Sequence, residues 1–153
     1  MNNKILISSC LLGNKVRYDG KSKPIAHPQI STWQQQGRLI VICPEVEGGL
    51  SVPRIKAEQR LDKVISEQGQ DVTAQFKAGA QLALNLCLKH DIKYAILKEF
   101  SPSCGSTKIY NGKFNGEKIN GQGITAKLLM GHGISVYSEL SIEQLIADLN
   151  ASN

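Results

Sequence analysis

Three of the four cysteines stand at or just beyond the ends of short apolar segments. Cys10 directly follows the first of these segments, Cys43 ends the second, and Cys104 lies a few residues beyond the third. Short apolar segments of this kind, rich in β-branched residues, are typical of strands buried in a parallel sheet. The carboxyl ends of such strands share one edge of the sheet and adjacent strands are about 4.8 Å apart, so the three thiols can converge there.

Three convergent thiolates suggest a metal site, but their number is unusual. Structural zinc usually takes four protein ligands, often in paired cysteine spacings, and the chain contains no Cys-x-x-Cys motif. Iron–sulfur clusters also usually take four cysteines, so three would leave one iron open to a substrate. An open iron can act as a Lewis acid on a soft donor such as sulfur. A redox or electron-transfer iron–sulfur protein and a zinc-stabilised binding module remain alternatives.

Polar residues that could move protons lie beside two of these cysteines. Glu45 follows Cys43 by two positions, and Ser101 precedes Cys104 by three. A carboxylate near a metal can serve as a general base for water, and a hydroxyl can donate a proton or orient a substrate. Glu47 and Ser103 offer the same chemistry nearby, and an exposed carboxylate with a turn serine would look the same in sequence.

The elements that must position these residues alternate along the chain. Strands are predicted at 4–9, 38–43, 94–97 and 134–137, and helices at 29–36, 72–89, 123–130 and from Ser141 onward. This alternation predicts an α/β fold in which a four-stranded, mainly parallel sheet lies between two layers of helices. The strand order 2-1-3-4 would place Cys10 between Cys43 and Cys104. Cys87 falls on the apolar face of the long helix, where we expect a buried structural thiol.

Turn residues predict hairpins outside this sheet. Alternating Leu61, Val64 and Ile65 favour a small hairpin, and Asn-Gly pairs at 111–112 and 115–116 favour a second short one.

Composition limits the remaining possibilities. With 153 residues, 41% hydrophobic and 20% charged, the chain is expected to form one domain over residues 1–153. Its longest apolar run, 39–43, is far shorter than the roughly 20 residues of a membrane-spanning helix, so we expect a cytoplasmic protein with reduced thiols. The net charge is +5 without a Lys/Arg block, so a tRNA partner is possible but not favoured, and a monomer is expected.

Five short motifs together resemble the thiouracil desulfidase (TudS) family. They are Ser-Cys-Leu-Leu-Gly at 9–13, Val-Arg-Tyr-Asp-Gly at 16–20, Cys-Pro-Glu-Val at 43–46, Ser-Pro-Ser-Cys-Gly at 101–105 and the glycine-rich segment 121–126. The resemblance covers nearly the whole chain in the same order, and the motifs at 43–46 and 101–105 are its most specific parts.

The resemblance implies an enzyme that removes sulfur from a thiolated pyrimidine. It implies a [4Fe-4S] cluster held by Cys10, Cys43 and Cys104, with the remaining iron open to the sulfur of thiouracil. Water would replace that sulfur at the ring carbon, with Glu45 and Ser101 assisting proton transfer. Uracil and hydrogen sulfide would leave without net oxidation or reduction.

Overall fold

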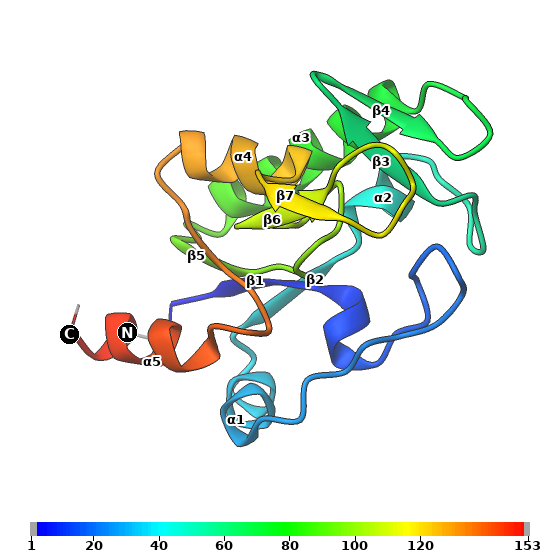
Figure 1. Cartoon of the computed structure of the whole chain (residues 1–153). Coiled ribbons are helices and arrows are strands. Elements are labelled where there is room, and N and C mark those ends of the chain that lie inside the picture. Colours follow the sequence, from blue (N-terminus) through cyan, green and yellow to red (C-terminus); the bar gives the residue numbers. More distant parts are fainter. Residues whose placement is uncertain (1–2, 152–153) are drawn as a thin grey trace.

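The sheet has the strand order expected from the sequence. A computed structural model describes residues 3–151 of the chain. Its four parallel strands are β1 (Ile5–Ser8), β2 (Leu39–Ile42), β5 (Tyr94–Ile96) and β8 (Ser135–Tyr137), in the order β2-β1-β5-β8 (Figure 1). Ile7 on the central strand β1 is paired with Val41 on one side and with Ile96 on the other. The predicted α/β fold and the order 2-1-3-4 are therefore confirmed.

Helices cover both faces of this sheet and complete three layers (Figure 1). The helices α3 (Thr73–Lys89) and α4 (Ile124–Gly131) lie on one face, and α1 (Pro28–Gln35) and α5 (Ile142–Ala151) lie on the other. Successive side chains of β1 point to opposite faces of the sheet. Leu6 packs in the core beneath α3 and α4, while Ile5 and Ile7 pack in the core on the other face. The sheet is thus apolar on both faces, and Ser8 places a hydroxyl at its carboxyl edge.

Two antiparallel hairpins stand outside the main sheet. One joins β3 (Ala57–Arg60) to β4 (Lys63–Ser66), and the other joins β6 (Lys108–Tyr110) to β7 (Lys118–Asn120). Both hairpins were predicted, the first from the alternation of Leu61, Val64 and Ile65 and the second from its Asn-Gly pairs. The predicted alternation was wrong for Leu61. This residue lies in the turn between β3 and β4, where its φ is 56° and its side chain is 97% exposed.

Two one-turn elements were missed by the sequence patterns. These are η1 (Ser9–Leu12), a 3₁₀ turn directly after β1, and α2 (Pro44–Glu47), which starts directly after β2. Each is too short to show the helical repeat of apolar residues. Pro44 at the first helical position of α2 is nevertheless a recognised signal for the start of a helix. No helix within residues 3–151 combines the length and the apolar character required to cross a membrane.

Candidate functional site

The structure brings three of the four cysteine side chains to one cavity. Cys10 lies in η1, Cys43 is the residue before α2, and Cys104 lies in the loop that follows β5. All three line a cavity of about 980 Å³ at the carboxyl edge of the sheet. Cys87 is 1% exposed on α3 and packs in the core, away from the cavity lining.

Burial and mutual proximity govern the ionisation of these thiols. Burial raises the pKa of Cys10 to about 11, and neighbouring Cys43 adds to this effect. Burial also raises the pKa of Cys104, with further increases from the nearby Glu45, Cys43 and Cys10. These groups therefore lie within electrostatic reach of one another. Thiolates at this site need a compensating positive charge, which a bound metal group supplies.

Close backbone packing positions Cys43. The turn α2 rests on α3 at two glycines, where side chains would collide with the opposing backbone. A Cβ on Gly79 would lie 1.8 Å from the carbonyl oxygen of Pro44, and one on Gly48 would lie 2.0 Å from that of Gln75. Because real atoms do not approach so closely, glycine is required at both positions. The contact fixes the start of α2 and, with it, Cys43.

The loop that carries Cys104 is held by a helix N-terminus. Backbone N–H groups of Gly123, Ile124 and Thr125 at the start of α4 donate to the carbonyls of Gly105, Pro102 and Ser103 at 2.7, 2.9 and 2.8 Å. The first N–H groups of α4 are thereby satisfied within the protein. The glycine-rich segment 121–126 thus supports the cysteine loop, and Gly123 allows the close approach, since a Cβ there would lie 2.3 Å from the Ser103 carbonyl.

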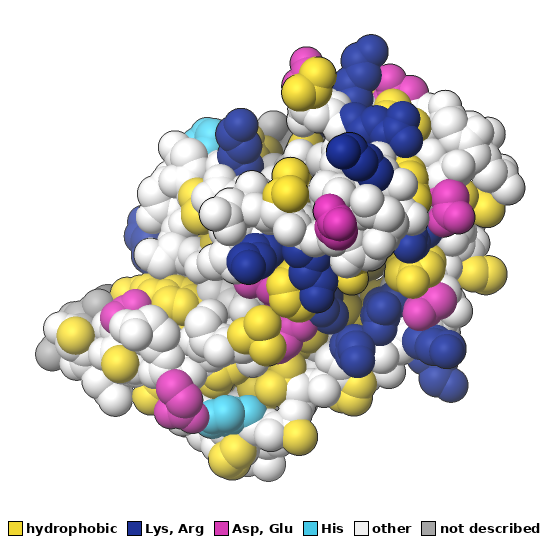
Figure 2. Space-filling view, viewed as in Figure 1, with side chains coloured by type: hydrophobic (Ala, Val, Ile, Leu, Met, Phe, Trp, Pro, Cys, Tyr) yellow, Lys and Arg dark blue, Asp and Glu magenta, His cyan; other side chains and the backbone are white. Residues whose placement is uncertain are grey.

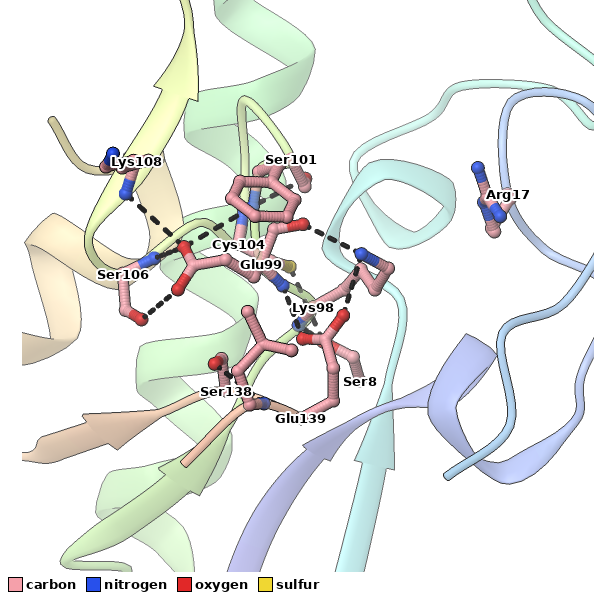
Figure 3. A network of polar contacts seen from close by, with 12 residues as sticks. Ser8, Arg17, Lys98, Glu99, Ser101, Cys104, Ser106, Lys108, Ser138 and Glu139 are labelled. Atoms are coloured by element: carbon pink, nitrogen blue, oxygen red, sulfur yellow. Dashed lines mark hydrogen bonds and ion pairs between the residues drawn. The ribbon is translucent and has the colours of Figure 1, made fainter. Parts of the chain in front are cut away.

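A buried carboxylate organises the same loop from the other side (Figure 3). Glu99 is 3% exposed, and its Oε1 accepts the N–H groups of Ser106 and Thr107 at 2.9 and 3.1 Å. Its Oε2 accepts the hydroxyls of Thr107 and Ser106 at 2.9 and 3.3 Å. Burial alone would raise the pKa of Glu99, but these donors outweigh it and hold the pKa below its usual value. Glu99 is therefore a structural anion that holds this loop.

Lys98 and Ser8 connect this loop to the sheet (Figure 3). The Lys98 ammonium lies 2.7 Å from Oε2 of Glu139 and donates to the Glu99 carbonyl at 2.9 Å. Ser8, buried at the end of β1, accepts the Lys98 backbone N–H at 3.0 Å and donates to Sγ of Cys104 at 3.6 Å. The hydroxyl therefore couples the central strand to one of the three thiols.

The structure separates Ser101 from Ser103 by their partners. Oγ of Ser101 accepts the backbone N–H groups of Ser103 and Cys104 at 3.0 and 3.1 Å, and Ser101 lines the cavity. Ser103 is fully buried, pairs with the Thr125 hydroxyl at 2.8 Å and does not line the cavity. Since a hydroxyl has two lone pairs and one proton, Ser101 keeps its proton for a further acceptor.

Glu45 and Glu47 also differ in position. Glu45 lines the cavity, and its Oε2 accepts a hydrogen bond from Nη2 of Arg54, whose side chain is only 7% exposed. Arg54 is itself anchored, because its Nη1 donates to the Ser51 carbonyl at 3.1 Å and its backbone N–H donates to the Tyr18 carbonyl at 2.8 Å. Glu47 does not line the cavity. The pairing of Arg54 with Glu45 was not predicted from the sequence, because it depends on how the loop after α2 folds back.

Basic side chains surround the same opening. Figure 2 shows Lys and Arg side chains gathered on this face of the molecule. The cations that line the cavity are Arg17, Lys23, Arg54, Lys56, Lys98 and Lys118. Arg54 and Lys98 are neutralised by carboxylates, whereas Lys118 lies 3.9 Å from the centre of the Phe100 ring. Five carboxylates, Glu45, Glu58, Glu99, Glu139 and Glu143, line the same cavity, so its charges are nearly balanced and it suits polar ligands.

A single metal ion and an iron–sulfur cluster require different arrangements of the three thiols. Within residues 3–151, no group of three or more His, Cys, Asp or Glu side chains is arranged to hold a metal ion. A mononuclear zinc site draws its ligands to within about 2.0 to 2.3 Å of one atom. An iron–sulfur cluster instead takes each cysteine on a different iron and so accommodates a wider spacing.

The comparisons with known proteins agree with this geometry. Residues 5–141 match the family model described as 2-thiouracil desulfurase. A solved structure named [4Fe-4S]-dependent thiouracil desulfidase TudS is 50% identical to the chain, with a TM-score of 0.96 over 97% of this chain and 99% of that one. An uncharacterised Bacillus subtilis (strain 168) protein, YbbK, is 38% identical over 93% of this chain and 99% of its own length. The chain belongs to the 2-thiouracil desulfurase family.

Proposed function

We propose that this protein removes sulfur from thiouracil by hydrolysis, giving uracil and hydrogen sulfide without net redox change. In this proposal Cys10, Cys43 and Cys104 hold a [4Fe-4S] cluster. The observation that carries the proposal is the convergence of these three thiols with Glu45 and Ser101 on one cavity. A solved relative named as a [4Fe-4S]-dependent thiouracil desulfidase, half identical in sequence, supports it.

The residues present fit such a cluster. The three thiols form no disulfide, lie at the carboxyl ends of adjacent parallel strands and face a cavity of about 980 Å³. This volume can hold a cluster together with a pyrimidine, because ligand pockets of about 300 to 1,000 Å³ accommodate drug-sized molecules. When bound through three thiolates, the cluster supplies an iron that can take the substrate sulfur as a Lewis acid.

Ser101 is suited to donate a proton. Its two lone pairs accept the N–H groups of Ser103 and Cys104, so its O–H is directed to other acceptors and is polarised by those two donors. In the proposed reaction this O–H donates to the thiouracil ring, where negative charge develops as water adds to the carbon that bears sulfur.

Glu45 is suited to activate the water. Arg54 binds its Oε2 and fixes the plane of the carboxylate, and we assign Oε1 as the atom that takes a proton from water. The carbon–sulfur bond breaks and a carbon–oxygen bond forms, while both protons of the water leave with the sulfur as hydrogen sulfide. No electron acceptor or donor is required, which distinguishes this function from the redox alternative.

The test compares two carboxylates on one turn. Glu45→Gln is expected to keep iron and labile sulfide at the wild-type level and to lower kcat for thiouracil by at least about a hundredfold, the scale of general base catalysis. Glu47→Gln, two residues away on α2 and outside the cavity lining, is the matched control and should retain turnover. Desulfuration by Glu45→Gln at the wild-type rate would remove Glu45 from the mechanism.

The cysteines allow a similar comparison. Cys10→Ser, Cys43→Ser and Cys104→Ser are each expected to lose the cluster, measured as iron and sulfide per chain after anaerobic reconstitution. Cys87→Ala should keep both, because this thiol packs in the core on α3. A cluster that persists without turnover in the wild type would favour the electron-transfer alternative.

A further inference from the structure

Phe100 adopts a backbone conformation that its residue type disfavours. Its φ is 70°, in the left-handed region where a bulky side chain is a genuine outlier. The surroundings impose this turn, because Glu99 accepts the Phe100 N–H at 3.4 Å and residue 100 forms a parallel bridge with Ile109. Glycine would satisfy the same turn without strain, so the chain tolerates a cost at this position and retains a large aromatic ring.

The ring lies in the wall of the cavity, beside the loop that carries Ser101 and Cys104. Phe100 is half-buried, lines the cavity and directly precedes Ser101. Nζ of Lys118 on β7 lies over the ring at 3.9 Å from its centre and therefore occupies one ring face, while Nζ of Lys98 lies 5.5 Å from the centre. Cation–π contacts at these distances hold the plane of an aromatic ring. The cavity therefore contains an oriented aromatic surface next to a hydroxyl donor.

We propose that Phe100 is a specificity-determining residue, and that the planar pyrimidine ring of the substrate stacks on the ring face that Lys118 does not cover. This inference rests on the proposed function and names how the base is held. Stacking on Phe100 places the ring of the base beside Ser101, so that its carbon–sulfur bond is presented to the thiol side of the cavity. Ring stacking also selects a flat, unsaturated ring over a puckered one, because only a flat ring can maintain full face contact.

The experiment compares thiouracil with 5,6-dihydro-2-thiouracil. The two share the same polar groups, but the saturated ring is not flat. Dissociation constants are measured by calorimetry on the anaerobic, cluster-bearing protein, alongside KM and kcat. Wild type is expected to prefer thiouracil by roughly tenfold or more, the scale of base–aromatic stacking. Phe100→Leu should lose most of this preference, mainly through weaker thiouracil binding, and Phe100→Tyr should keep it.

The content of iron and labile sulfide per chain shows whether a variant has damaged the loop that carries Cys104 and lost the cluster. Should Phe100→Leu lose its cluster, Phe100→Gly replaces it, since glycine accepts φ 70° without strain. An unchanged preference in the cluster-bearing variant, or an equal loss for both compounds, would overturn the stacking role. Wild-type binding without turnover would contradict the proposed function alone, because the dissociation constants still report on stacking. No binding of thiouracil to wild type would overturn both.

Discussion

Cys43 and Cys104 face the same cavity, but different kinds of interaction hold them in place. Cys43 depends on shape, because α2 and α3 meet backbone to backbone at Gly48 and Gly79. Cys104 depends on polar groups, because its loop is tied by the Glu99 carboxylate and the N-terminus of α4. Added volume should not be tolerated at Gly48 and Gly79, nor at Gly123 beside the Cys104 loop, whereas the contacts of Glu99 make the Cys104 loop sensitive to charge and pH. Different substitutions should therefore displace Cys43 and Cys104.

The largest expected effect is on the packed region. Gly79→Ala would place a Cβ 1.8 Å from the Pro44 carbonyl oxygen, so α2 must move and Cys43 with it. We expect the free energy of unfolding to fall by about 3 kcal/mol, the upper range for overpacking, and the iron content to drop sharply. Chemical denaturation and iron analysis measure the two effects.

Gly131→Ala is the matched control for that variant. Gly131 ends α4, and a Cβ there meets no atom within 4 Å. Alanine favours a helix over glycine, so this variant should be unchanged or more stable by up to about 1 kcal/mol. Equal losses in both variants would mean that the loss in Gly79→Ala does not come from the contact between α3 and α2.

A smaller effect is expected in the polar region. Glu99→Gln keeps the shape but removes the charge and turns an N–H₂ group toward some of the donors in the Cys104 loop. Hydrogen bonds to a charged group are each worth more than neutral ones, so we expect a loss of about 2 kcal/mol in the free energy of unfolding. Glu143→Gln, at a carboxylate that is 83% exposed, should change it by less than about 0.5 kcal/mol.

The pH dependence separates the two regions further. The pKa of Glu99 lies below its usual value, so its stabilising contribution is complete above the unfolded pKa of about 4.3 and is lost as the pH falls through the lower folded value. Cluster-free wild type and Gly79→Ala should therefore lose stability alike below about pH 5, and Glu99→Gln should lose less. The pKa of Asp71 is also lowered, by its hydrogen bonds with Thr73, but this carboxylate contributes equally to the acid response of wild type and both variants. Parallel curves would show that Glu99 does not control the acid response.

The same contrast explains which parts of the structure could be predicted from sequence. Apolar segments and the alternation of strands and helices predicted four parallel strands and therefore a shared edge for Cys10, Cys43 and Cys104. The strand order followed from the hypothesis that the strands carrying these cysteines are neighbours. The contact at Gly79 has no local signature, because the glycine sits inside an otherwise regular helical pattern and its partner is about 35 residues away. The role of Glu99 was equally hidden, since its donors belong to a loop with no regular period.

The smallest expected effect concerns Ser8, which joins the two regions through the central strand. Its hydroxyl accepts the Lys98 N–H at 3.0 Å and donates to Sγ of Cys104 at 3.6 Å. Ser8→Ala leaves the N–H unpaired in a buried position, so we expect a loss of about 1 kcal/mol in the free energy of unfolding with iron content retained.

Hydrogen bonds to ligand sulfur raise the reduction potential of a cluster, because they stabilise its more negative, reduced form. Ser8→Ala should therefore shift the potential downward in anaerobic spectroelectrochemistry, whereas Ser8→Thr, which keeps the hydroxyl, should shift it less. An unchanged potential in Ser8→Ala would mean that this hydroxyl holds only the backbone of Lys98 and not the thiolate.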